Sequence, residues 1–145
     1  STAHDLDNVK DITVTLANGR NLTGRLTKRD PHRDLALIQV DYRFSSSVNV
    51  NNERKRLKAG EKIYALTCSK GERTILSGVI AGVVKPSENL LLWQVDMETP
   101  PGSSGSPVFD REGKIIAVVK GRYRGIPSIG FLIPLETVAA FLNEK

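Results

Sequence analysis

The chain has 145 residues, of which 39% are hydrophobic and 26% charged, an ordinary composition for one globular domain or two small units that share an interface. It contains no apolar run near the ~20 residues that cross a bilayer and no charged-then-apolar signal segment at its start, so we expect no integral membrane segment. The single cysteine, Cys68, excludes an internal disulfide and a cysteine metal cluster. The net charge is +5, but the basic residues cluster only at 54–58 and 120–124, outside any nucleic-acid motif, so a solvated face is expected rather than a nucleic-acid partner.

Short β-branched runs that end at turn residues dominate the first part of the chain. Residues 11–16 (DITVTL) alternate apolar and polar positions, which predicts a half-buried strand. Asn18-Gly19 follows, and because both residues tolerate positive φ it predicts a hairpin into a second strand at 21–30. Residues 34–40 (DLALIQV) predict a third, more buried strand.

A second series of apolar runs follows a polar stretch at 41–58. Six strands are expected, at 62–68, 74–85, 90–96, 106–110, 114–120 and 128–134. Residues 134–145 instead combine a proline, an acidic first turn and apolar residues at helical spacing, which predicts a short terminal helix. Closely spaced short strands with one helix predict an all-β fold of barrels or a sandwich.

The loop at 99–110 (TPPGSSGSPVFD) has the residues that nucleophilic serine catalysis requires. Such catalysis needs an exposed serine hydroxyl on a tight turn and backbone N–H groups aimed at the developing oxyanion. Ser104 can supply the hydroxyl, and Gly102, which lacks a Cβ, can turn its N–H inward beside that of Ser104. By itself a G-x-S-G loop is weak evidence, since such motifs also match linker loops.

The base must come from one of two histidines. His32 lies in an "HRD" tripeptide, but no phosphate loop, strand lysine or D-F-G accompanies it, so it is expected in a surface turn. His4, taken alone, is typical of a residue near a chain end. Asp34, at the entry of the buried strand, could orient an imidazole. The chain order His4, Asp34, Ser104 is that of chymotrypsin-type enzymes.

With these residues in place, the chain resembles the trypsin-like fold and is most similar to the HtrA (Deg) serine proteases. The matching segments are HDLDNVKDITVTLANGRNLTGRLTKRDPHRDLALIQVD, LKAGEKIYAL, TILSGVIAG, WQVDMETPPGSSGSPVF and SIGFLIP, which cover nearly the whole chain. GSSGSPVF alone is nearer to the glutamyl endopeptidases. The resemblance implies His4 as general base, Asp34 as its orienting carboxylate and Ser104 as nucleophile, with the N–H groups of Gly102 and Ser104 as the oxyanion hole.

The same resemblance implies a two-barrel chymotrypsin-like fold with a short C-terminal helix. Residues 1–45 would be the N-terminal barrel, 46–58 a connecting segment and 59–145 the C-terminal barrel. Members of this fold carry about three strands before the catalytic histidine, so the first barrel is expected to be incomplete at its N-terminus. Ser103 stands where relatives often have Asp or Asn before the nucleophile.

Substrate contacts are predicted at two places. Glu98 lies six residues before Ser104, where trypsin has its pocket carboxylate, and would favour substrates with Lys or Arg; alternatively it faces solvent or pairs with a nearby base. Val119, Lys120 and Gly121 are expected to form the edge strand against which an extended substrate pairs.

The sequence therefore predicts a serine endopeptidase that processes polypeptides through an acyl-enzyme, as in HtrA-like protein processing or quality control. No metal or cofactor is implied. Family resemblance suggests a location outside the cytoplasm and a homo-oligomer, often a trimer. Two alternatives stay open: an inactive protease-fold module that binds peptides or a protein partner, and a basic β-domain that binds nucleic acid.

Overall fold

The structure, a computed structural model, describes residues 1–51, 57–69 and 71–144. The chain divides into two compact units, Ser1–Val48 and Asn49–Lys145, which are described in turn. The basic cluster at 54–58 lies largely outside the described residues.

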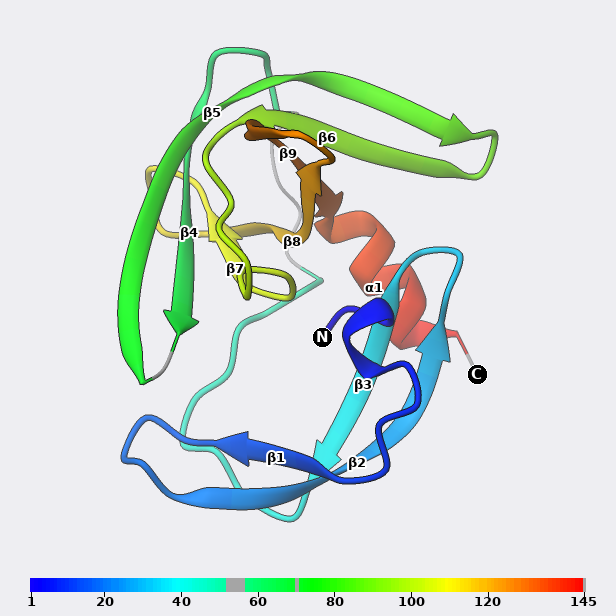
Figure 1. Ribbon diagram of the computed structural model, residues 1–145, viewed down its shortest axis with the longest axis vertical. Helices are drawn as coiled ribbons and strands as arrows, with labels where there is room; N and C mark the ends of the chain where they lie inside the picture. Colours follow the sequence, from blue (N-terminus) through cyan, green and yellow to red (C-terminus); the bar gives the residue numbers. More distant parts are fainter. Residues whose placement is uncertain (52–56, 70, 145) are drawn as a thin grey trace. The chain divides into compact units, whose positions relative to one another are not determined.

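The N-terminal unit is a three-stranded antiparallel sheet preceded by one short 3₁₀ helix (Figure 1). Its elements are the 3₁₀ helix η1 (His4–Leu6) and the strands β1 (Ile12–Thr15), β2 (Asn21–Asp30) and β3 (Leu35–Val40), paired in the order β1-β2-β3. The expected hairpin joins β1 to β2, with Gly19 at φ 85° and the Leu16 N–H donating to the Arg20 carbonyl at 2.8 Å. The sheet is open, because β1 and β3 each pair only with β2.

One face of this sheet is apolar and packs closely over Gly24. A Cβ at Gly24 would lie 2.7 Å from the Ile38 Cγ2 and 3.0 Å from the Ile12 Cγ2, so only glycine lets these two side chains approach each other across β2. Ile12 and Ile38 are nevertheless only half-buried. The alternation predicted for residues 11–16 is therefore present, but most of the burial in this unit occurs elsewhere, around the start of β3.

The C-terminal unit is a closed antiparallel barrel followed by one helix (Figure 1). Its strands are β4 (Lys62–Ser69), β5 (Glu72–Ser87), β6 (Leu90–Asp96), β7 (Pro107–Phe109), β8 (Ile115–Tyr123) and β9 (Ile126–Pro134), and its helix is α1 (Leu135–Asn143). The barrel closes in the order β4-β5-β6-β9-β8-β7, and α1 contacts β8 and β9. The predicted all-β fold with one C-terminal helix is confirmed.

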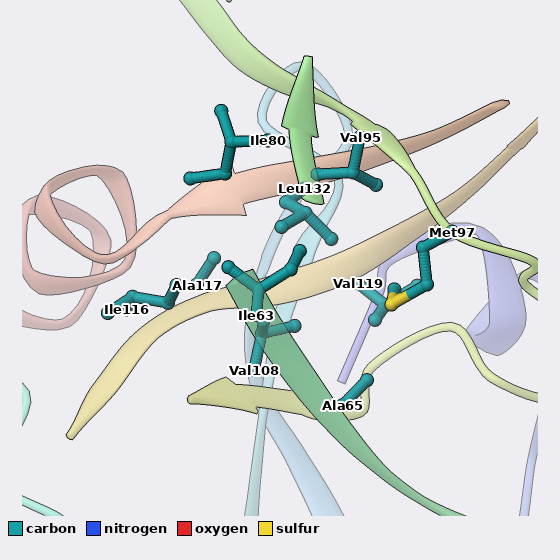
Figure 2. Packing of buried hydrophobic residues seen from close by; sticks show 10 residues of the cluster. All are labelled: Ile63, Ala65, Ile80, Val95, Met97, Val108, Ile116, Ala117, Val119 and Leu132. Atoms are coloured by element: carbon teal, nitrogen blue, oxygen red, sulfur yellow. The ribbon is translucent and has the colours of Figure 1, made fainter. Parts of the chain in front are cut away.

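Alternation along the barrel strands directs side chains into a single core, and on β8 the neighbours Ile116 and Ala117 both belong to it. Figure 2 shows ten of these side chains, which come from all six barrel strands and the segment after β6. They are Ile63, Ala65, Ile80, Val95, Met97, Val108, Ile116, Ala117, Val119 and Leu132. Met97, the first residue after β6, also belongs to this core. The core therefore fixes the start of the loop that follows β6.

Strands β8 and β9 are longer at their shared end than the sequence indicated. The predicted ranges stop at Lys120 and begin at Ser128, whereas the hairpin continues to Tyr123 and resumes at Ile126. Gly125, at φ 83°, makes the turn between them. The sequence did not predict this extension, because the basic residues at 120–124 are typical of a solvated loop as well as of an exposed strand end.

We expect Leu132→Ala to lower the free energy of unfolding by about 3 kcal/mol, because Leu132 is fully buried and its removal leaves a cavity where β6, β8 and β9 meet. Ile75→Ala is the matched control, since Ile75 is 69% exposed, and should change it by less than about 0.5 kcal/mol. Urea denaturation followed by Trp93 fluorescence measures both. Equal losses in the two variants would show that this core does not carry the stability of the barrel.

Candidate active site

His4 and Asp34 form a close pair in the N-terminal unit. The His4 Nδ1 lies 2.6 Å from the Asp34 Oδ2, and the His4 backbone N–H donates to the Asp34 Oδ1 at 2.8 Å. Both carboxylate oxygens therefore face the same residue, one holding the main chain and the other the ring. This arrangement fixes the ring orientation and favours a proton on Nδ1, which leaves Nε2 as the acceptor of the neutral imidazole.

Asp34 is held rigidly because its backbone and side chain are both constrained. Asp34 is only 5% exposed. Its backbone adopts a left-handed conformation with φ 60°, which aspartate tolerates better than most residues. Its carbonyl accepts a hydrogen bond from the Ala3 N–H at 3.1 Å. This conformation turns the chain from the preceding turn into β3 and leaves the carboxylate beside His4.

The segment before His4 pairs with β3 through two backbone hydrogen bonds between Ser1 and Ala36. The Ala36 N–H donates to the Ser1 carbonyl at 2.9 Å, and the Ser1 α-amino group donates to the Ala36 carbonyl at 3.1 Å. Burial lowers the pKa of this amino group, an effect that the Asp5 carboxylate opposes. Since the folded state disfavours the protonated amine, this group favours folding more above its ordinary pKa of 8.0 than below it.

Asp5 faces the other nitrogen of the His4 ring. Its Oδ1 lies 3.4 Å from the His4 Nε2, and its Oδ2 accepts a hydrogen bond from the fully buried Thr2 at 2.6 Å. Asp5 is thus a second carboxylate near the imidazole, placed on the nitrogen that a general base must use. Sequence reasoning did not single it out, and the adjacent position in an HD dipeptide was its only signal.

In the C-terminal unit, Ser104 is presented by a loop fastened to β8. The Ser104 hydroxyl donates to the Lys120 carbonyl at 2.9 Å. The Gly105 N–H donates to the Val119 carbonyl at 2.8 Å, and the Val119 N–H donates to the Ser106 carbonyl at 2.9 Å. These three hydrogen bonds fix the position of the loop that carries Ser104 against β8.

The turn before Ser104 leaves two N–H groups available. Gly102 has φ 90°, a conformation that favours glycine, as the sequence led us to expect. Within the described part of the chain, the N–H groups of Gly102 and Ser104 have no protein acceptor. The intervening Ser103 closes the turn, because its hydroxyl and its N–H both donate to the Pro100 carbonyl, at 2.6 and 3.1 Å.

Thr99 is a buried residue of this region that sequence reasoning passed over. It is 2% exposed, and its hydroxyl has no hydrogen-bond partner among the described residues. Its Cγ2 lies 3.1 Å from where a Cβ on Gly130 would stand, and a Cβ on Gly121 would lie 3.8 Å from the Ser104 Oγ. The Gly121 carbonyl oxygen lies 3.6 Å from the same Gly130 position, so Thr99, Gly130 and Gly121 follow one another toward Ser104.

The residues predicted to contact substrate occupy different environments. Glu98 is exposed and makes no ion pair within the described residues, including with Lys120 or Arg122. Val119, Lys120 and Gly121 do lie on one strand, β8, but both backbone polar groups of Val119 are already bonded to the serine loop. Lys120 and Gly121 also lie beside Ser104, but within the described part of the chain their backbone groups form no hydrogen bond to the backbone of the serine loop.

His32 occupies an exposed turn, as expected, and is not part of either arrangement. Among the described residues, no group of three or more His, Cys, Asp or Glu side chains could hold a metal ion. No helix in the described part of the chain is long and apolar enough to cross a membrane.

The chemistry that these residues offer is complementary. The N-terminal unit holds an imidazole whose Nδ1 is engaged by a buried carboxylate, the usual arrangement of a general base. The C-terminal unit carries a serine hydroxyl next to two backbone donors on a tight turn, the usual arrangement of a nucleophile with an oxyanion hole.

Comparison with known proteins points the same way. Residues 1–118 match the family described as a trypsin-like peptidase domain. The chain is 27% identical over 154 residues to the serine protease Do-like HtrB of Bacillus subtilis, covering 97% of this chain and 34% of that protein. It is 29% identical over 148 residues to a probable periplasmic DegP-like serine endoprotease of Hahella chejuensis, covering 97% of this chain and 31% of that protein. The chain thus spans about a third of the length of these curated relatives.

Solved structures show the same fold. The active form of the Rv3671c protease of M. tuberculosis matches with a TM-score of 0.85 and 20% identity, over 98% of this chain and 66% of that one. An HtrA-type protease, AlgW, solved with a decapeptide, matches with a TM-score of 0.82 and 21% identity, over 98% of this chain and 46% of that one.

We expect Thr99→Val to raise the melting temperature by about 3 °C, because it removes a buried hydroxyl that has no partner at almost no change in volume. Thr67→Val is the matched control: the Thr67 hydroxyl is also buried but donates to the Thr74 carbonyl at 3.1 Å, so its loss should lower the melting temperature by a similar amount. Differential scanning calorimetry measures both. A destabilised Thr99→Val would mean that the Thr99 hydroxyl is satisfied in solution.

Proposed function

The chain belongs to the trypsin-like peptidase domain family, and from this membership we propose that it is the catalytic domain of an HtrA-like serine endopeptidase with the triad His4, Asp34 and Ser104. The observation that carries the proposal is the His4–Asp34 pair, in which a buried carboxylate engages the Nδ1 of an imidazole at 2.6 Å. In a catalytic triad the general base depends on such a carboxylate, which orients the imidazole and stabilises its protonated form.

In the proposed first step, the His4 Nε2 accepts the Ser104 hydroxyl proton as the Ser104 Oγ attacks the scissile carbonyl carbon. Asp34 keeps the Nδ1 proton and stabilises the imidazolium that forms. The carbonyl oxygen becomes an oxyanion, to which the N–H groups of Gly102 and Ser104 donate. Each such donor typically contributes 10²–10³ in rate, since it is already oriented when the charge develops.

The tetrahedral intermediate then collapses. His4 gives its proton to the leaving amine, which departs and leaves an ester on the Ser104 Oγ. Water attacks that ester, again with His4 as base, and the released Ser104 hydroxyl restores the starting state. No cofactor enters either half of the reaction as written.

The resting hydrogen bond of Ser104 bears on this mechanism. Its hydroxyl donates to the Lys120 carbonyl at 2.9 Å, so this bond must be given up before the proton can pass to a base. The cost is about 1 kcal/mol, the net value of an ordinary hydrogen bond, which is small against the barrier of peptide hydrolysis.

The relatives support a role in protein processing or quality control outside the cytoplasm, since several are named periplasmic serine endoproteases. Polypeptides are then the substrates, and Lys120 and Gly121 are the proposed pairing strand beside Ser104. A homo-oligomeric, trimeric assembly remains part of the proposal, on family resemblance.

A fluorophosphonate probe, which phosphonylates activated serines, tests the triad. We expect Ser104→Ala to abolish labelling, and His4→Ala and Asp34→Asn to slow it by about 10³–10⁴, because each removes the base or its orientation. The rate of probe incorporation, followed by in-gel fluorescence, is the measurement.

His32→Ala is the matched control for His4→Ala, since it removes the other histidine of the chain from an exposed turn. It should label at the wild-type rate. Labelling that survives in His4→Ala, or that falls equally in His32→Ala, would refute the assignment of His4 as base.

A separate substitution tests the specificity proposed for Glu98. Because this side chain is exposed, its attraction for a substrate Lys or Arg is screened by water and amounts to less than about 1 kcal/mol. Glu98→Gln should therefore lower kcat/KM for peptides cleaved after Lys or Arg by only about three- to fivefold, and leave cleavage after Leu unchanged. A loss of 10²-fold or more would place Glu98 in a dry pocket, and no change would remove it from the site.

A further inference from the structure

An apolar groove on the outer surface of the barrel unit shares only Lys120 with the site described above. It lies between the β5–β6 and β8–β9 hairpins and has a volume of about 620 Å³. Its walls include Leu92, Ile129 and Phe131, which lie on the face of β6 and β9 opposite to the core residues Val95 and Leu132. A concave apolar surface of this size is typical of a ligand site rather than of an ordinary solvated barrel face.

The rim of the groove is aromatic and basic. Tyr123, which is 51% exposed, stands against Phe131 with ring centroids 6.2 Å apart, and Ile126 is 42% exposed. Lys85 lines the groove, is exposed and forms no ion pair within the described part of the chain. None of the lining side chains, all of them in the described residues, is a carboxylate.

Lys120 connects the groove to Ser104. Lys120 lines it, and the carbonyl of the same residue accepts the hydrogen bond from the Ser104 Oγ. An extended chain advances about 3.3–3.6 Å per residue, so a polypeptide held at Ser104 along β8 reaches the groove within a few residues. The concavity favours a peptide over a flat lipid surface, because an occupant must enter the groove to cover Ile129 and Phe131, which are partly exposed.

We propose that this groove binds a segment of the polypeptide substrate, a few residues from the cleaved bond, in which large apolar side chains are flanked by carboxylates. The apolar side chains would pack on Phe131 and Tyr123, and a flanking carboxylate would meet Lys85. This inference rests on the proposed function and adds a preference that the triad does not supply.

The test measures binding of three fluorescein-labelled ten-residue peptides to the full chain carrying Ser104→Ala, so that cleavage does not intervene. In the first peptide Phe and Leu alternate with Glu, in the second they alternate with Lys, and in the third Gly replaces Phe and Leu. We expect the first to bind at least tenfold more tightly than the other two by fluorescence polarisation, with weaker binding at higher salt.

Single substitutions locate the binding. Lys85→Glu and Tyr123→Ala should each weaken binding of the first peptide at least fivefold. The matched controls, Lys62→Glu on β4 and Ile75→Ala on β5, change an exposed lysine and an exposed apolar residue outside the groove and should have no effect.

Equal binding of the three peptides, or equal effects of groove and control variants, overturns the groove proposal. Binding to phosphatidylserine vesicles without peptide binding also overturns it, in favour of a lipid surface. Peptide selectivity in a chain that never reacts with the fluorophosphonate probe overturns the substrate role and with it the proposed function. Probe labelling without peptide selectivity removes the groove alone.

Discussion

The contact between the Asp34 carboxylate and His4 is the constraint on which the rest of the account depends. One carboxylate oxygen holds the His4 main chain and the other faces its ring, so a single side chain positions both the residue and its imidazole. The left-handed conformation of Asp34 aims that carboxylate, and the pairing of Ser1 with Ala36 holds the chain on which His4 sits. Without these local bonds, a histidine so close to the end of the described chain would have no defined orientation.

The loop that carries Ser104 is held mainly by hydrogen bonds to backbone carbonyls. Ser103 closes the turn on Pro100, and Gly102 adopts the positive φ that turns its N–H away from the chain. The Gly105 N–H donates to the Val119 carbonyl and the Val119 N–H donates to the Ser106 carbonyl, and these two bonds fix the loop on β8. Each half of the proposed chemistry is therefore rigid by itself, and electrostatic stabilisation requires that rigidity because donors must be oriented before charge develops.

Much of the fold could be predicted from local pattern. Period-two alternation and turn residues located the strands to within a few residues, and the chain order of His4, Asp34 and Ser104 suggested the triad, of which the structure shows the His4–Asp34 contact. Features that depend on tertiary contact escaped. The 3₁₀ helix at His4 has no pattern of its own, and the loop between Asp96 and Pro107 has no periodicity to show that Thr99 is buried while Glu98 is exposed. The approach of Asp5 to the His4 ring likewise follows from the helix that Thr2 helps to hold.

The tautomer of His4 tests the central claim most directly, because its ring has a carboxylate at each nitrogen: Asp34 at 2.6 Å from Nδ1 and Asp5 at 3.4 Å from Nε2. Long-range ¹⁵N–¹H correlation spectra of the neutral imidazole distinguish the two forms. The account predicts a proton on Nδ1, donated to Asp34, and a bare Nε2 able to accept the proton of a serine. A proton found on Nε2 would contradict it, since His4 could not then act as the general base.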